Sequence, residues 1–140
     1  MREKRYKDMG YKFYGWENAT VPAVSDEYPG IATPQALYDA LSNIWCQYTC
    51  APRMRDKWSE DNKTLGQCSI TAFLAQDIFG GEVYGIELPD GNYHLFNDVG
   101  GCVFDLTSEQ FDEELDYSCT FTSKVSDALS RFLSSDISGA

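Results

Sequence analysis

Apolar residues recur at helical spacing in two segments of the chain. The first begins at Thr33-Pro34, where an N-cap residue precedes a proline at the first helical position. Its apolar positions then follow the helical period on one face: Leu37, Leu41, Ile44, Trp45 and Tyr48. The pattern predicts an amphipathic helix that ends near residues 50–52.

The second helical segment covers residues 68–79 and is closed by Gly80-Gly81, a natural helix stop. Its apolar residues occupy most of the helix circumference: Ile70, Ala72, Phe73, Leu74, Ala75, Ile78 and Phe79. A helix with apolar residues on nearly all sides is usually surrounded by protein. We therefore expect this helix to lie at the centre of the fold.

Three short segments after this helix read as strands, over residues 82–88, 93–97 and 102–106. Turn-forming residues separate them at 89–92 and 98–101. The strands therefore predict an antiparallel meander. A capped helical turn at 107–111, an acidic stretch to Asp116 and a last amphipathic helix from about Ser123 complete the pattern.

A length of 140 residues suits one domain with one core. Residues 1–30 are aromatic, basic and then rich in proline and glycine, without a sustained helical or strand period. We expect 1–30 to form an N-terminal arm and 31–140 to form a single α+β domain. In that domain the central buried helix packs on an antiparallel sheet of three or more strands, with flanking helices.

The net charge of −11 is unevenly distributed. Residues 1–12 hold five basic and two acidic residues, so the rest of the chain carries −14. Such a body repels phosphates, which disfavours direct nucleic-acid binding. A well-solvated acidic surface is the simplest interpretation, and a basic protein partner or mimicry of a nucleic acid is the alternative.

No stretch approaches the roughly 18 apolar residues of a membrane span. The basic N-terminus is also not followed by the apolar segment of a secretory signal. We therefore expect a cytoplasmic protein that does not bind membranes.

The chain has five cysteines, an odd number that does not suggest a disulfide framework in the cytosol. Cys46 and Cys50 would share one face of a helix, but no second close pair of ligands accompanies them. We expect no metal and no cofactor. Four of the cysteines are interpreted as small apolar fillers: Cys46, Cys50, Cys102 and Cys119.

Cys68 differs because it stands where the second helix begins. The aligned peptide dipoles and free N–H groups of a helix N-terminus lower the pKa of a thiol and favour the nucleophilic thiolate. A thiol nucleophile also needs a base, normally a histidine that a third polar group orients. His94, the only histidine, lies on the second predicted strand.

Asp105 is the favoured third member of this group. If the 98–101 turn is symmetric about its middle, His94 and Asp105 are direct cross-strand neighbours on one face. A slip of two residues would instead put Thr107 opposite His94. Asn97 is a weaker candidate, because three residues along a strand it points to the other face.

An acyl transfer also needs hydrogen-bond donors for the developing oxyanion. The backbone N–H of Cys68 is one donor by its position. The side-chain amide of Gln67 or that of Asn62 is the second, and the sequence favours neither.

Several motifs together resemble those of the YunG-like family of bacterial proteins. They are Trp58-Ser59-x-x-Asn62-x-x-x-Gly66-Gln67-Cys68, Thr71-Ala72, Gln76-Asp77, Phe79-Gly80-Gly81, His94-x-x-Asn97 and Asp105-Leu106-Thr107-x-x-Gln110-Phe111. The resemblance covers about residues 34–111. The order of cysteine, histidine and acid also resembles papain-fold thiol hydrolases, which implies a papain-like fold with Cys68, His94 and Asp105 as the catalytic residues. Cell-wall amidases of that fold are usually exported, so the absence of an export signal here disfavours peptidoglycan as substrate.

Two functions follow as hypotheses. The first is a papain-like cysteine hydrolase or transferase that acts on an amide or thioester in a small-molecule or peptide substrate. The second is a non-catalytic acidic interaction protein, or an inhibitor that mimics a nucleic acid for a basic partner. A third reading is an enzyme fold that has lost catalysis, which a fully buried Cys68 sulfur would indicate.

Overall fold

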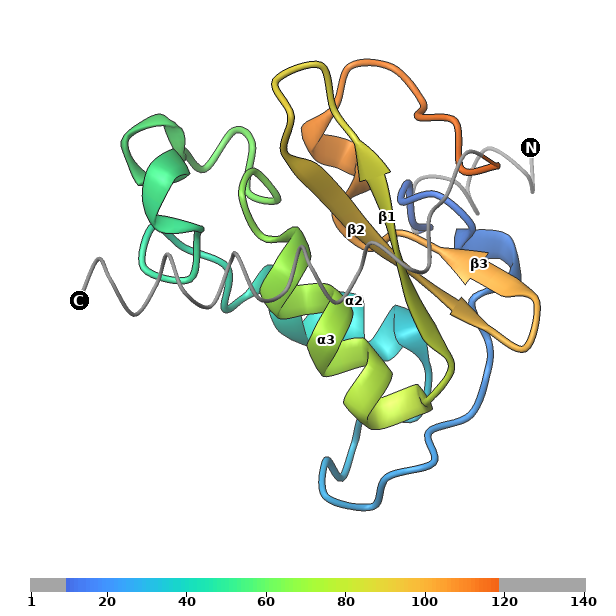
Figure 1. Cartoon of the computed structure of the whole chain (residues 1–140). Coiled ribbons are helices and arrows are strands. Elements are labelled where there is room, and N and C mark those ends of the chain that lie inside the picture. The colour runs from blue at the N-terminus through green and yellow to red at the C-terminus, as the bar shows by residue number, and fades with distance from the viewer. Residues whose placement is uncertain (1–9, 119–140) are drawn as a thin grey trace, which may run out of the picture.

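The fold is α+β, with helices packed on a three-stranded antiparallel sheet of order β1-β2-β3. It is described from a computed structural model over residues 10–118 (Figure 1). The strands are β1 (Glu82–Glu87), β2 (Tyr93–Val99) and β3 (Cys102–Phe104), and the α-helices are α2 (Pro34–Ser42) and α3 (Cys68–Phe79). Three short 3-10 helices complete it: η1 (Trp16–Asn18), η2 (Pro52–Lys57) and η3 (Ser108–Gln110). The predicted meander is confirmed.

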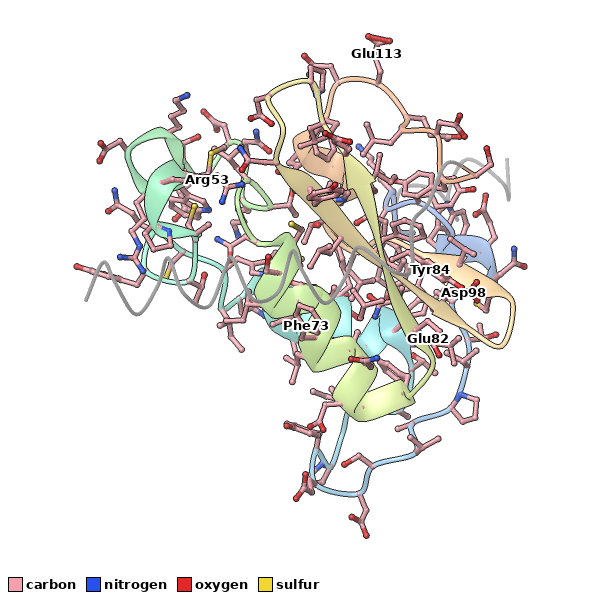
Figure 2. The ribbon with its side chains drawn as sticks, in the orientation of Figure 1. Arg53, Phe73, Glu82, Tyr84, Asp98 and Glu113 are labelled. Carbon is pink, nitrogen blue, oxygen red and sulfur yellow. The ribbon has the colours of Figure 1, made fainter. Side chains whose placement is uncertain are left out.

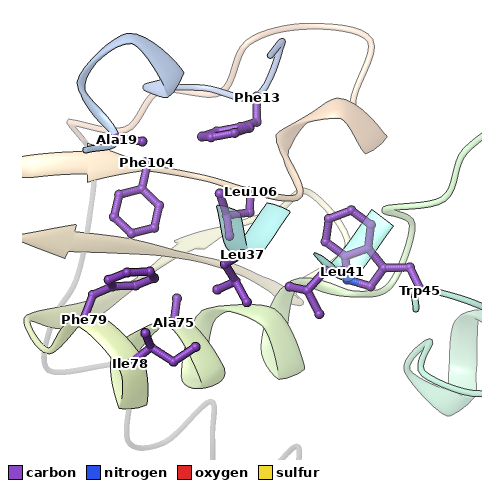
Figure 3. Close-up of a cluster of buried hydrophobic side chains, with 10 residues drawn as sticks. All are labelled: Phe13, Ala19, Leu37, Leu41, Trp45, Ala75, Ile78, Phe79, Phe104 and Leu106. Atoms are coloured by element: carbon purple, nitrogen blue, oxygen red, sulfur yellow. The ribbon is translucent and has the colours of Figure 1, made fainter. Parts of the chain in front are cut away.

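Helix α3 has the bounds that the sequence predicts, from Cys68 to the Gly80 C-cap. It lies across β1 and β2 with α2 beside it (Figure 1). Its buried residues Ala75, Ile78 and Phe79 form the main core with residues of α2, β3 and the N-terminal segment (Figure 3). Protein does not surround the helix on every side, since Ile70 is 49% exposed.

Helix α2 starts as predicted but is much shorter. The Thr33 hydroxyl caps its first turn by accepting from Ala36 N at 3.2 Å. The helix ends at Ser42 with Asn43 as the C-cap, and Ile44 N then bonds Leu41 O in a tighter turn. Asparagine favours such an end because its side chain competes with the helical backbone bonds.

After this turn the chain leaves the helical path, so the predicted continuation to about residue 50 is wrong. Trp45 is buried and donates from Nε1 to Thr71 Oγ1 of α3 at 3.0 Å. Ile44 and Tyr48, which match the helical period, are 54% and 83% exposed. Cys46 and Cys50 consequently do not share a helix face.

The turn between β2 and β3 is tighter than the symmetric 98–101 turn that the sequence suggested. Val99 pairs with Cys102 and Asn97 with Phe104, so only Gly100-Gly101 form the loop. Both glycines have positive φ, +60° and +93°, as a two-residue hairpin turn requires. The pairing of His94 directly opposite Asp105 is therefore wrong, and the register is the one slipped by two residues.

This slip keeps Asp105 on the face that His94 occupies, because side chains alternate with a period of two. Strand β3 ends at Phe104 rather than at 106. Asp105 instead forms a bridge with Tyr14, and its N–H donates to Tyr14 O at 3.0 Å. The acid thus reaches His94 diagonally across the sheet.

The described part of the N-terminal segment packs into the body. Phe13 and Ala19 are fully buried in the main core, and the Phe13 ring lies 5.0 Å from that of Tyr38 on α2 (Figure 3). Gly15 has φ +81°, and a Cβ there would lie 2.1 Å from Val103 O, so only glycine fits. The division into an arm and a domain at residue 30 stays a prediction.

Cys119 and the helix predicted from Ser123 lie outside the described residues. Within residues 10–118, no helix combines the length and apolar character needed to cross a bilayer.

Candidate functional site

Cys68 is the first residue of α3, and the residue as a whole is partly exposed. The first backbone hydrogen bond of the helix runs from Thr71 N to Gln67 O. The N–H groups of residues 68–70 therefore have no acceptor within the helix. The thiol therefore lies at the positive end of a twelve-residue helix.

The edge of β2 supplies a further donor to this thiol. Val99 and Cys102 flank a two-residue turn, so alternate residues of β2, among them Leu95, direct their N–H groups toward the β3 side. Strand β3 ends opposite Asn97, which leaves the Leu95 N–H free of the ladder. This N–H faces the Cys68 sulfur and helps to lower the pKa of the thiol.

His94 lies on β2 between Cys68 and Asp105. Its side chain is 1% exposed, and Nε2 lies 2.6 Å from Asp105 Oδ2. The ring also interacts with the Cys68 thiol, which contributes to the raised pKa of His94. Since Nε2 is engaged by the carboxylate, Nδ1 is the nitrogen left for the sulfur.

The Asp105 carboxylate, also 1% exposed, is surrounded by donors. Oδ2 accepts from His94 and from the Tyr117 hydroxyl at 2.7 Å, and Oδ1 accepts from Thr107 N at 3.2 Å and Thr107 Oγ1 at 3.3 Å. A carboxylate accepts at about four sites only when it is ionised. These bonds therefore hold Asp105 as the anion.

The surroundings lower the pKa of the Cys68 thiol and raise the pKa of the His94 imidazole. Burial raises the pKa of Cys68, but the hydrogen bond and charge of His94 and the Leu95 N–H outweigh it, so the net shift is downward. Burial lowers the pKa of His94, but the Asp105 charge and hydrogen bond, with a contribution from Cys68, raise it to about 10. Both shifts favour transfer of the thiol proton to the imidazole, which gives a thiolate–imidazolium pair.

The two amides considered as oxyanion donors differ in their surroundings. Gln67 is fully buried, its Nε2 donates to Cys46 O at 3.1 Å, and its Oε1 has no partner. Asn62 is half-buried in the 59–62 turn, and its side-chain amide has no hydrogen bond to any residue in 10–118. The Gln67 amide N–H is thus already used to hold the preceding loop, whereas the Asn62 amide could donate to a substrate.

Asn97 has a structural contact on the other face of the sheet, as its position predicts. Its Nδ2 donates to Ala72 O at 2.9 Å, which ties β2 to α3. Among residues 10–118, no group of three or more histidine, cysteine or acidic side chains is arranged to hold a metal ion.

Sequence reasoning missed three contributors to the site. Tyr117 bonds Asp105, the Phe111 ring lies edge-on to the His94 ring at 4.7 Å, and Gln110 Oε1 accepts from Gly66 N at 3.4 Å, two residues before Cys68. All three lie in or after η3, where no helical or strand period singles out a position. Only the Gln110-Phe111 pair within the family motif offered a signal.

Two clefts lie beside the N-terminal segment and the residues that follow Asp105. One of about 320 Å³ has Phe111 and Tyr117 in its wall, and one of about 440 Å³ is lined by residues 12–18 with Val103. Neither of these two clefts has Cys68 in its wall. They adjoin the carboxylate end of the site rather than the thiol.

Residues 33–134 match the model of the YunG protein family. The chain is also 41% identical over 77 residues to the "Uncharacterized protein YunG" of Bacillus subtilis (strain 168), a match that covers 55% of this chain. The match spans 62% of the length of that relative. No solved structure matches the chain. Because the family match extends over more than half of the sequence, the chain belongs to the YunG family.

Proposed function

We propose that this protein is a cysteine hydrolase or transferase that acts on an amide or thioester. The observation that carries this proposal is the contact series from the Cys68 thiol through the His94 ring to the Asp105 carboxylate. The order of helix start, strand and following segment supports a papain-like architecture. We propose the cytoplasm as the compartment.

In this mechanism the Cys68 thiolate attacks the substrate carbonyl carbon and forms a tetrahedral intermediate. The Cys68 N–H and a second donor, for which Asn62 is the better candidate, stabilise its oxyanion. The His94 imidazolium gives its proton to the leaving nitrogen or sulfur, and the intermediate collapses to an acyl–Cys68 thioester.

The second half of the reaction transfers the acyl group to water or to another acceptor. Neutral His94 takes a proton from this acceptor as it attacks the thioester, and the Cys68 thiolate leaves. Asp105 keeps the ring oriented and stabilises its positive charge. A small molecule or a peptide is the proposed substrate class.

Alkylation with dilute iodoacetamide at pH 7, followed at each cysteine by peptide mass spectrometry, tests the thiolate. Cys68 should react much faster than Cys50 and Cys102, whose pKa values burial raises. Cys46 is the instructive comparison, because hydrogen bonds with Thr49 and Tyr48 lower its pKa without a histidine.

The variant His94→Gln should therefore slow the alkylation of Cys68 at least about tenfold and leave Cys46 unchanged. Equal effects on both cysteines, or slow labelling of Cys68 in the native chain, would contradict the proposal. Incubation with a panel of acyl thioesters should then add one acyl group to Cys68, and none in the Cys68→Ser variant.

A second function, an acidic interaction protein, is favoured by one observation. Five exposed carboxylates follow the site along the chain: Glu109, Asp112, Glu113, Glu114 and Asp116. Glu113 projects away from the ribbon (Figure 2). On this alternative, Cys68→Ala keeps the biological activity and charge reversal of the five residues abolishes it, whereas the enzyme requires the opposite pattern.

A further inference from the structure

Tyr117 and His94 share one oxygen of the Asp105 carboxylate. The Tyr117 hydroxyl donates to Oδ2 at 2.7 Å, and His94 Nε2 lies 2.6 Å from the same atom. The other oxygen is held twice by Thr107. The carboxylate therefore has a fixed orientation, and its charge is divided between two donors on the His94 side.

The Tyr117 ring is fixed by aromatic contacts that do not involve the hydroxyl. It stacks on Tyr14 with centroids 3.9 Å apart and planes at 22°, and it meets Phe96 of β2 edge-on at 5.0 Å. Tyr14 is in turn tied to the backbone of Asp105. Removing the hydroxyl alone therefore leaves the packing of the ring in place.

A hydrogen bond to a carboxylate oxygen draws negative charge away from its other partners. If the carboxylate held His94 alone, the imidazolium would be stabilised more strongly and would release its proton less readily. The proposed mechanism needs that release when the leaving group departs.

We infer that Tyr117 is a positioning residue that shares Asp105 Oδ2 with His94 and thereby weakens the carboxylate's hold on the imidazolium. This inference rests on the proposed function, because only a reaction that cycles the His94 proton benefits from it.

Few other titratable groups face this network. His94 meets the Cys68 thiol of α3 and Asp105, while its β1 partner is the uncharged Ile86. Tyr117 meets Asp105, Tyr14 and, at longer range, Glu114. Burial and the Asp105 charge raise the pKa of Tyr117, which keeps its hydroxyl protonated as a donor.

The test uses NMR on the full chain with 15N-labelled histidine, because a single histidine gives an unambiguous ring signal. In native protein the His94 ring should titrate with a midpoint near 10. In Tyr117→Phe the midpoint should rise by about half to one pH unit, and the Nε2–H proton should move downfield at neutral pH.

A second variant reverses the sign. Site-specific 3-fluorotyrosine at position 117 keeps the shape of the ring but makes the hydroxyl a stronger donor, so the midpoint should fall. Tyr84→Phe is the matched control, since the Tyr84 ring also contacts Phe96, stacked on it at 5.9 Å, but has no hydrogen bond to Asp105. It should leave the midpoint unchanged.

A midpoint that does not move, or that falls in Tyr117→Phe, overturns the inference. Should Tyr117→Phe fail to fold, the fluorotyrosine protein decides: a lower midpoint supports the inference, and an unchanged or higher one overturns it. A native midpoint near the ordinary histidine value would instead contradict the thiolate–imidazolium pair, and with it the proposed function.

Discussion

At the scale of single residues, the site depends on how completely each polar atom near His94 is paired. His94 and Asp105 are both buried, and a buried charge is tolerated only when partners offset its loss of water. Four donors on Asp105 meet that requirement. Cys68, by contrast, is a partly exposed residue at the start of α3.

The free energy of unfolding should change with pH in a way that reflects the interaction between His94 and Asp105. The pKa of His94 is raised from 6.5 to about 10, so its stabilising contribution is complete below pH 6.5 and lost as the pH rises through 10. A Cys68→Ser background removes the opposing titration of the thiol and also its contribution to the raised His94 pKa. In this background the free energy of unfolding should fall from pH 6.5 upward, over a window that ends below pH 10. Its slope should approach about 1.4 kcal/mol per pH unit.

Urea unfolding at a series of pH values measures this slope. Adding Asp105→Asn to Cys68→Ser removes the charge that raises the His94 pKa, so the fall above pH 6.5 should become shallower. Parallel curves for the two proteins would show that Asp105 does not stabilise the imidazolium.

At the scale of elements, the sequence predicted α3 and the strands well because residues that end helices or form turns mark where these elements stop. Gly80-Gly81 ends the helix, and proline, aspartate and glycine turn the chain between β1 and β2. The end of α2 was not predictable in this way. Ile44 and Tyr48 continue the helical period although they are exposed, and only the contact of Trp45 with Thr71 shows why the chain turns.

The loop before α3 holds Cys68 in place through a close approach at Gly66. This residue has φ +72°, and a Cβ there would lie 2.4 Å from Cys50 Sγ. Gly66→Ala should therefore cost about 2–4 kcal/mol of stability, from both the strained φ and the overlap. Gly91→Ala is the matched control, with φ +87° and nothing within 4 Å of the added Cβ.

The control should cost about 1 kcal/mol, from the backbone conformation alone. Urea unfolding of both variants gives the difference. Equal decreases in the free energy of unfolding would mean that Cys50 can shift to accommodate the added Cβ. Gly66 would then be needed only for its positive φ.

At the scale of the whole molecule, the N-terminal segment completes the core rather than only lying on it. Phe13 is fully buried in the main core (Figure 3). Its ring also contacts the rings of Tyr11 and Tyr38, which pack against that core. Little in the amino-acid pattern indicates this, because residues 10–30 have no period that would mark a buried face. The same lack of a period hid Tyr117, whose role arises from long-range contacts with Tyr14 and Asp105.

Phe13→Ala should consequently destabilise the protein by about 3–5 kcal/mol, the usual cost of emptying a buried phenylalanine site. Val24→Ala, in the same segment but 73% exposed, is the control and should change stability by less than about 0.5 kcal/mol. Thermal and urea unfolding measure both. Similar stabilities for the two variants would mean that the segment is not part of the cooperative core.

The backbone bond between Asp105 and Tyr14 joins positions separated by ninety-one residues, and the thiol that it serves indirectly comes from a third place in the chain. Such a site cannot form in separate steps during synthesis or refolding. Its residues come into contact only after distant parts of the polypeptide have docked. If the proposed function holds, Cys68 reacts as an ordinary thiol until these parts have docked. Its rate of alkylation should then report whether a given molecule has reached the native state.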